Sequence, residues 1–548
     1  MSKSQKNLAP LPFTQLFGDT EENFYQLGIK DRERHNLILE SIKYLTKTPW
    51  KIIDKFIEEL IKGAIDKALP LHPEYKRLLT AYAEGLNRKA SELAYVYLIP
   101  EFISALNRWV PGLPTTLFGC STYMTRDSQT GEILHGRILD FPLQGSFDVL
   151  ERATLYAFNK RAKIFSYGTL GMPFPSITCM NEHGLTLALH QKFSNHLSST
   201  GIPIFYLVFE MMSHCRDLQD VRELLKRSRS ITTWGLYLTH KSGDVLAADI
   251  TPHGFHEKQL KLKEGDIIYL GNRTFDESIR SEDIMPWGLN VYNQNREDIA
   301  EIKMAQLKKK KNLGPIELLT AMGTQAKQKI KKSEYWKIDP LTPATIQNCV
   351  MNASSGASYF IPGKAPKFMQ EKLLEFSDLW NLPTQKMIDV KNSKFDSAVA
   401  KGYHALMEAQ VRHDKDDVHG CYHYCQLAID FLNNRPEEAI ARFYFSVFQF
   451  MHEEHQKMLA HLLADFKQLK GKLSPYLEDH RQLFVMRLER VLKLNISISI
   501  DQIENAHLKK IYEFEQKWKP QIVFTALRKL TNPRIEIFDI IYAHAKSA

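Results

Sequence analysis

One cysteine stands out because of the residues that follow it at short, fixed distances. Cys120 comes directly after a Pro-, Gly- and Thr-rich stretch and begins a run of β-forming residues. Arg137 and Asp140 lie in the next such run, so a hairpin would return both of them to the cysteine. An arginine beside a cysteine favours the thiolate, the form that attacks carbonyl carbon. The alternative is a small buried apolar residue at the start of a strand.

The elements that must position these residues fall into three blocks. Residues from about 20 to 110 carry apolar side chains at helical spacing and end in the linker VPGLPTTLFG. From 120 to about 370, short β-rich runs alternate with Gly, Asn or Asp turns, interrupted by two helical segments. From about 371 to the end the pattern is helical again. Strand runs and helices in this order indicate a layered α+β protein.

Composition excludes several classes of protein. The 548 residues are 44% hydrophobic and 25% charged, which excludes a disordered chain, a collagen and a disulfide-rich miniprotein. A chain of this length normally forms several domains. The net charge of +9, from 72 basic and 63 acidic residues, is too weak to indicate nucleic acid as a partner.

The cysteines and the apolar runs bear on the compartment. Six widely scattered cysteines do not form a disulfide framework, and this favours a reducing environment. The first residues lack the apolar region of a secretory signal, and no run reaches the length of a spanning helix. We therefore expect a cytoplasmic protein, and export by a specialised secretion system stays open.

The spacing from Cys120 to the sequence Gly136-Arg137-Ile138-Leu139-Asp140-Phe141 resembles a known family. It is similar to the N-terminal-nucleophile (Ntn) hydrolases of the choloylglycine hydrolase, acid ceramidase and penicillin acyltransferase group, which act on linear amide C–N bonds. Further stretches that resemble the family occur in order at 25–28, 81–86, 181–185, 270–272 and 345–366. The resemblance spans about residues 20–370.

The resemblance implies an architecture and a processing event. It implies a four-layer αββα Ntn-hydrolase core at 120–370, preceded by a helical segment at 1–119. In this family the precursor cuts itself before its nucleophile, here between Gly119 and Cys120, which would release the N-terminal segment as a separate chain. Residues 371–548 have no counterpart in the resemblance, and we expect them to form an all-α domain.

The resemblance also implies roles for individual residues. Cys120 would form a thioester with the substrate, and its new α-amine would serve as the base, since such amines titrate near neutral pH. The remaining assignments are Arg137 to support the thiolate, Asp140 to hold the α-amine, Asn272 to donate to the oxyanion, Arg280 as a further family arginine, and Asn181 and His190 as oxyanion or substrate candidates. His190 and Ile138 depart from the family, which has asparagine at both positions.

We therefore expect a self-processing N-acyl amidohydrolase that uses neither a metal nor a cofactor. An acyltransferase that uses the same thioester is one alternative, and a non-catalytic interaction protein with a partner-binding C-terminal domain is another. The lysines between Lys308 and Lys332 form either a solvated face or a surface for anionic membranes. We expect a small N-acyl amide as substrate and no nucleic acid as partner.

Overall fold

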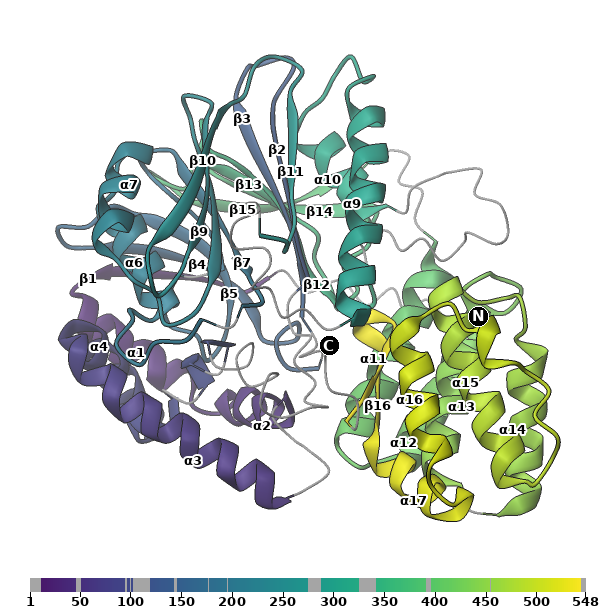
Figure 1. Ribbon diagram of the computed structural model, residues 1–548. Helices are drawn as coiled ribbons and strands as arrows, with labels where there is room; N and C mark the ends of the chain where they lie inside the picture. The colour runs from purple at the N-terminus through teal and green to yellow at the C-terminus, as the bar shows by residue number, and fades with distance from the viewer. Residues whose placement is uncertain are drawn as a thin grey trace, which may run out of the picture.

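The computed structural model shows a mixed helix-and-strand protein (Figure 1). It describes residues 11–45, 51–93, 96–98, 100–101, 119–141, 145–175, 177–194, 196–274, 287–324, 342–390, 396–453 and 455–543. Arg280, the lysines from 327 to 332 and the residue before Gly119 lie outside these ranges. Among the described helices, none combines the length and the apolar character needed to cross a membrane.

Two large sheets form the centre of the described chain. The strands of the first, in sheet order, are β1 (Phe13–Gly18), β4 (Glu151–Phe158), β5 (Ile164–Thr169), β6 (Thr178–Asn181), β7 (Leu185–Gln191), β8 (Trp234–His240), β9 (Asp244–Ile250) and β10 (Phe255–Lys261). All neighbouring pairs are antiparallel except β1 with β4. The N-terminal segment, which the sequence indicated to be helical, therefore also supplies an edge strand.

The second sheet carries the cysteine. Its strands, in sheet order, are β11 (Ile267–Leu270), β2 (Gly119–Arg126), β3 (Ile133–Asp140), β12 (Thr345–Asn352), β13 (Ala357–Phe360), β14 (Lys372–Ser377) and β15 (Thr384–Asp389). Strands β2 and β3 form the hairpin that the sequence predicted. Both are buried along nearly their whole length, as expected for strands covered on two faces.

The two sheets face each other, and helices cover their outer faces. Apolar side chains of β4, β5 and β6 pack against those of β12, β13 and β14. The outer face of the first sheet packs on N-terminal helices and on α6 (Ile204–His214) and α7 (Leu218–Arg227). The outer face of the second packs on α9 (Trp287–Leu307) and α10 (Pro315–Gly323). Burial of these apolar faces is the main favourable term in folding.

The N-terminal helices are held closely to the first sheet. They are α1 (Thr20–Asp31), α2 (His35–Leu45), α3 (Lys51–Ala68) with η1 (Leu69–Leu71), and α4 (Pro73–Leu86). Helices α1 and α4 cross at Gly28 and Gly85, where a Cβ on either residue would overlap the other helix. Asp31 at the end of α1 pairs with the buried Arg152 of β4.

Two further strands of the second sheet precede the C-terminal helices. Strands β14 and β15 extend the second sheet past residue 370, so the predicted boundary falls before the end of the sheet. The described helices are α11 (Ser397–Asp414), α12 (Val418–Leu432), α13 (Glu438–His452), α14 (Gln456–Gln468), α15 (Pro475–Val491), η3 (Ile500–Gln502), α16 (Ala506–Gln516), α17 (Pro520–Leu530) and η4 (Ile535–Ile537). A hairpin of β16 (Thr531–Arg534) and β17 (Asp539–Tyr542) means that this domain is not all-α.

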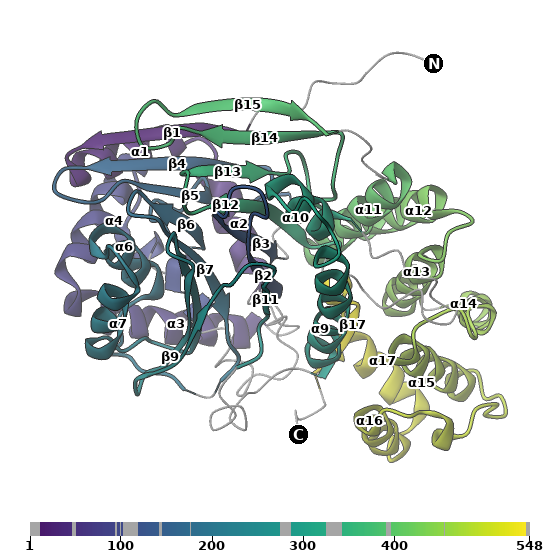
Figure 2. The ribbon, with the colours of Figure 1, turned by 90° about the horizontal axis from the view of Figure 1, so that it is seen from above.

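Helix α9 lies between the sheets and the C-terminal domain. Both views of the ribbon show it there, with the yellow end of the chain beside its first turns (Figures 1 and 2). Among the described elements, it contacts β11 on one side and both η4 and β17 on the other.

Candidate active site

Cys120 and Arg137 meet in the space between the two sheets. The hairpin register pairs Thr122 with Arg137, which places the arginine two positions along the neighbouring strand from the cysteine. Arg137 Nη2 lies 2.9 Å from Cys120 Sγ and donates to the Leu189 carbonyl of β7 at 2.6 Å. Both side chains are buried, with 1% exposure for the cysteine and 0% for the arginine. A guanidinium this close stabilises negative charge on sulfur.

His190 supports Arg137 in one defined protonation state. Its Nε2 lies 2.6 Å from Arg137 Nη1, which can only donate, so Nε2 must accept. Its Nδ1 lies 3.2 Å from the Gly271 carbonyl and therefore carries the hydrogen. Burial and the charges of Arg137, Lys192 and Arg296 hold the pKa of His190 well below its usual value. Both ring nitrogens are engaged, so the ring orients Arg137 and does not present a donor to an oxyanion.

Asn272 lies against the backbone of Cys120. Its Oδ1 accepts the Cys120 N–H at 2.6 Å, and its Nδ2 donates to the Gln191 carbonyl at 3.0 Å. The sequence-based expectation was donation to an oxyanion, but in this uncut chain the amide group is occupied by backbone. Asn272 is thus beside the Gly119–Cys120 peptide bond, and its side chain bonds backbone groups where the sequence analysis expected an oxyanion.

A buried lysine holds the loop that carries Asn272. Lys192 Nζ donates to the Arg273 carbonyl at 2.6 Å and contacts the Tyr237 hydroxyl and Asp249. The Tyr237 hydroxyl in turn donates to the Gly271 carbonyl at 3.1 Å. The carbonyls on both sides of Asn272 are therefore fixed, and this orients its side chain toward Cys120.

Asp140 sits opposite Gly119 across the hairpin. The register pairs the two residues, and a Cβ at position 119 would lie 2.7 Å from Asp140 Oδ2. Glycine is therefore required for the carboxylate to approach the chain at this point. Asp140 accepts hydrogen bonds from Tyr292 at 2.7 Å and Thr345 at 2.5 Å. Burial raises its pKa, and Arg296 with these two hydrogen bonds opposes the shift.

Two site residues come from helix α9 and were not identified from the sequence. Arg296 donates to the Ser121 hydroxyl at 2.6 Å and to Asn272 Oδ1 at 3.2 Å, and lies 3.6 Å from Asp140. Tyr292 holds Asp140 from the same helix face, one turn earlier. The sequence analysis selected Arg280, which lies outside the described residues. The available signal was a Tyr and an Arg four positions apart in a helical segment that follows Asn272, which is α9, the first described helix after it.

Asn181 does not join this cluster. It ends β6, and its side chain closes the turn to β7 by accepting from the His183 and Leu185 amides. Its Nδ2 donates to the carbonyls of Met212 and Cys215 at the end of α6. Its hydrogen bonds serve the turn and the end of α6, so the structure does not bring Asn181 together with Cys120 and Arg137.

The lysine stretch differs from the buried cluster around Cys120 in its exposure to solvent. Lys308 to Lys311 follow the end of α9 and are exposed, as a solvated face would be. The remaining lysines of that stretch are not among the described residues.

The assembled cluster has the parts that acyl transfer needs. A buried thiol has a fixed cation beside it, and a carboxylate lies against the residue before it. Hydrogen-bonding side chains surround the backbone between the thiol and the carboxylate. Other buried groups hold these side chains in place. Such preorganised donors and charges stabilise charge that develops on a carbonyl oxygen or on sulfur.

Comparisons with known proteins give weak similarity. No protein-family model matches the sequence, and no curated protein matches it. Among solved structures, a conjugated bile acid hydrolase mutant from Clostridium perfringens is similar over 50% of this chain and 98% of its own, at 12% identity and a TM-score of 0.31. A Caenorhabditis elegans ortholog of N-acylethanolamine-hydrolyzing acid amidase is similar over 46% and 97%, at 12% identity and 0.29. Penicillin V acylase from Agrobacterium tumefaciens is similar over 50% and 87%, at 16% identity and 0.26. TM-scores of this size assign neither a fold nor an activity.

Proposed function

We propose that the protein is a self-processing cysteine amidohydrolase of the Ntn type, with an αββα core and Cys120 as its nucleophile. The observation that carries this proposal is the contact between the Cys120 thiol and the Arg137 guanidinium. Cys120 directly follows Gly119, and the backbone of Gly119 lies against the Asp140 carboxylate. A buried cysteine of purely structural function has no need of a guanidinium. Cys179 provides the contrast within this chain, because burial alone raises the pKa of its thiol.

The first reaction cuts the chain. The Cys120 thiolate attacks the Gly119 carbonyl carbon, a C–S bond forms, and the C–N bond of the peptide breaks as its nitrogen takes a proton. Water then hydrolyses the thioester, which leaves a carboxylate on Gly119 and a free thiol and α-amine on Cys120. Arg137 stabilises the sulfur, Asn272 accepts from the nitrogen of Cys120, and Asp140 lies against Gly119 to hold the new amine.

The second reaction uses the same thiol on a substrate. The α-amine of Cys120 takes the thiol proton, the sulfur attacks the carbonyl of a linear non-peptide amide, and the amine product leaves with a proton. Water releases the acyl group from the thioester. An amine in place of water would make the same site an acyltransferase, so an assay that offers both acceptors decides between the two reactions.

Intact mass spectrometry under denaturing conditions tests the central step. The wild-type protein should give two chains, one ending at Gly119 and one starting at Cys120, after incubation across neutral and acidic pH. Cys120→Ala should remain a single chain without amidase activity. Cys179→Ala, which removes a buried thiol that contacts no arginine in the described part of the chain, should be cut as the wild type is. A wild-type chain that stays uncut at every pH contradicts the proposal.

A further inference from the structure

Helix α9 carries two residues of the candidate site, but its first turn is held by the C-terminal domain. The Gly288 N–H donates to the Asp539 carboxylate of β17. A Cβ on Gly288 would overlap that carboxylate, whose Oδ2 is its nearest neighbour. The two chain segments are therefore in direct contact at the point where α9 begins.

Asp539 is fixed from its own side. Its Oδ1 accepts from the Tyr476 hydroxyl at 2.6 Å and from the Ile540 N–H at 2.7 Å, and its backbone carbonyl accepts from Tyr444. The side chain is buried. Because Oδ1 is occupied within the C-terminal domain, Oδ2 is the oxygen presented to α9.

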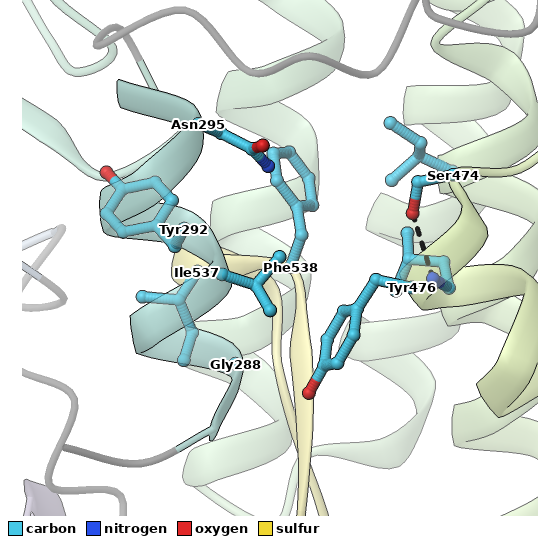
Figure 3. A pocket seen from close by; sticks show the side chains of 10 residues that line it. Gly288, Tyr292, Asn295, Ser474, Tyr476, Ile537 and Phe538 are labelled. Atoms are coloured by element: carbon cyan, nitrogen blue, oxygen red, sulfur yellow. Dashed lines mark hydrogen bonds between the residues drawn. The ribbon is translucent and has the colours of Figure 1, made fainter. Parts of the chain in front are cut away.

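Apolar packing reinforces the same contact. Ile537 of η4 clusters with Phe193, Leu289 and Tyr292, and Tyr292 is the residue that holds Asp140. Figure 3 shows Tyr292 on α9, Tyr476 on the opposite side of the pocket, and Ile537 and Phe538 of the C-terminal domain between them. The cavity left between them is about 20 Å³, room for little more than one water molecule. The junction is therefore a packed contact and not a ligand site.

Asp539 places a negative charge at the first turn of α9. Free N–H groups at a helix N-terminus favour an anion, and α9 has no acidic residue in its own first turn. We propose that Asp539 is a positioning residue for the proposed reaction, which holds α9 so that Tyr292 and Arg296 meet Asp140. The C-terminal helical domain is then a working part of the enzyme. This inference rests on the function proposed above.

The expected effect on the reaction follows from geometry. Tyr292 and Arg296 lie one and two turns from Gly288, so a shift of the helix start moves both of them against Asp140. Misplacement of a catalytic group by about 1 Å can cost roughly 10²-fold in rate. We expect a 10- to 100-fold loss in the rate of Gly119–Cys120 cleavage when the Asp539 contact is removed, an estimate on the same basis.

Two variants remove the contact in different ways. Asp539→Asn keeps the Oδ1 acceptor for Tyr476 but removes the charge and places an amide against the Gly288 N–H. Gly288→Ala keeps Asp539 and inserts a methyl group into the contact. The matched control is Asp479→Asn, because Asp479 also accepts two backbone N–H groups, from Glu504 and Asn505, but lies within the C-terminal domain.

A pH profile separates positioning from loss of stability. Burial raises the pKa of Asp539 to about 6, so its charge is present at pH 8 and mostly absent at pH 5. Other titratable groups that face it are Tyr476 and His480 of α15, Tyr444 of α13, Glu536 of η4 and Tyr542 of β17. The group of α9 that faces Asp539 is the N–H of Gly288. The ratio of wild-type to Asp539→Asn cleavage rates should therefore be large at pH 8 and approach one at pH 5.

Hydrogen exchange of α9 in the same proteins completes the experiment. Support for the inference is faster exchange at 287–300 and slower cleavage in both variants, a rate ratio that shrinks with acid, and an unchanged Asp479→Asn control. Cleavage at the wild-type rate in both variants overturns the inference and leaves the proposed function intact. A constant rate ratio across pH, or an equal loss in the control, assigns Asp539 a merely structural role and also overturns it. A wild-type chain that is never cut removes the premise and contradicts the proposed function itself.

Discussion

Two buried arginines of the central strands have opposite kinds of partner. Arg152 on β4 donates from Nη1 to both oxygens of Asp31, at 2.7 and 2.9 Å, and the Tyr82 hydroxyl donates to the same carboxylate. Arg137 on β3 donates to a thiol, an imidazole and a carbonyl. Among the described residues, no carboxylate lies within ion-pair distance of Arg137.

Under the proposed function, the difference separates a charge that stabilises the fold from one that takes part in the reaction. A buried cation with a bidentate carboxylate is neutralised, and it serves to join α1 to the sheet. A buried cation that faces a thiol is neutralised only when the sulfur ionises. Arg137 thus carries a buried charge that no described carboxylate neutralises, and in the proposed function this charge supports the sulfur of Cys120.

The largest expected effect comes from breaking the neutralised pair. Asp31→Ala leaves Arg152 buried without its carboxylate, so the free energy of unfolding should fall by about 3–5 kcal/mol. Urea denaturation monitored by circular dichroism measures the change. Asp244→Ala, which removes an exposed partner of Lys261, should cost about 0–1 kcal/mol. Equal losses in the two variants would show that the Asp31 pair contributes no more than a surface pair.

Removing the other arginine should affect the reaction more than the fold. In Arg137→Gln the thiolate and the developing oxyanion lose their cation, so Gly119–Cys120 cleavage should slow by about 10²–10³-fold. Stability should change little, because the variant also removes a buried charge that has no carboxylate among the described residues. Rapid-quench sampling followed by intact mass gives the rate. Wild-type cleavage kinetics in this variant would place Arg137 with Arg152 as a structural residue.

A third buried ionisable group, Glu101, joins the N-terminal segment to α6 and the first sheet, and among the described residues no cation pairs with it. It accepts from the Ile204 N–H and the Trp234 indole at 2.7 Å each, and burial raises its pKa to about 7. The folded state therefore binds the proton more tightly than the unfolded state, and the stability gained below pH 4.5 is lost as the pH rises through 7. Between pH 5 and pH 8 the wild type should lose about 2–3 kcal/mol relative to Glu101→Gln. Parallel stability curves for the two proteins would contradict this.

The smallest effect concerns the residue that holds Asp140. Tyr292→Phe removes one hydrogen bond to a buried carboxylate and should slow cleavage about tenfold, equivalent to about 1.4 kcal/mol. The lost bond favours the ionised form, so the pKa of Asp140 should rise further and the acid limb of the pH–rate profile should move to higher pH. Tyr359→Phe, which removes a hydroxyl bonded to Glu375 on β14, is the control. An unshifted acid limb would separate Tyr292 from the ionisation of Asp140.

Much of the site's frame could be predicted from the sequence, and some of its members could not. The mixture of helices and strands followed from apolar periodicity, and the β2–β3 hairpin from two β-rich runs close in sequence. Arg280 and Arg296 both follow Asn272, and periodicity does not predict that Arg296 contacts Ser121 and Asn272. Asn181 was assigned to the site because of its motif, although the same motif is explained by a tight turn.

Short-range information determined that Cys120, Arg137 and Asp140 lie near one another, because a hairpin constrains residues only about twenty positions apart. The tertiary structure decided what surrounds them. His190 accepts from Arg137 only because β7 of the first sheet faces β3 of the second. Tyr292 and Arg296 reach Asp140 only because α9 packs across the second sheet, with Asp539 at its start. These contacts join residues from about fifty to about two hundred and fifty positions apart, and no local pattern of side chains encodes which distant elements will bury one another.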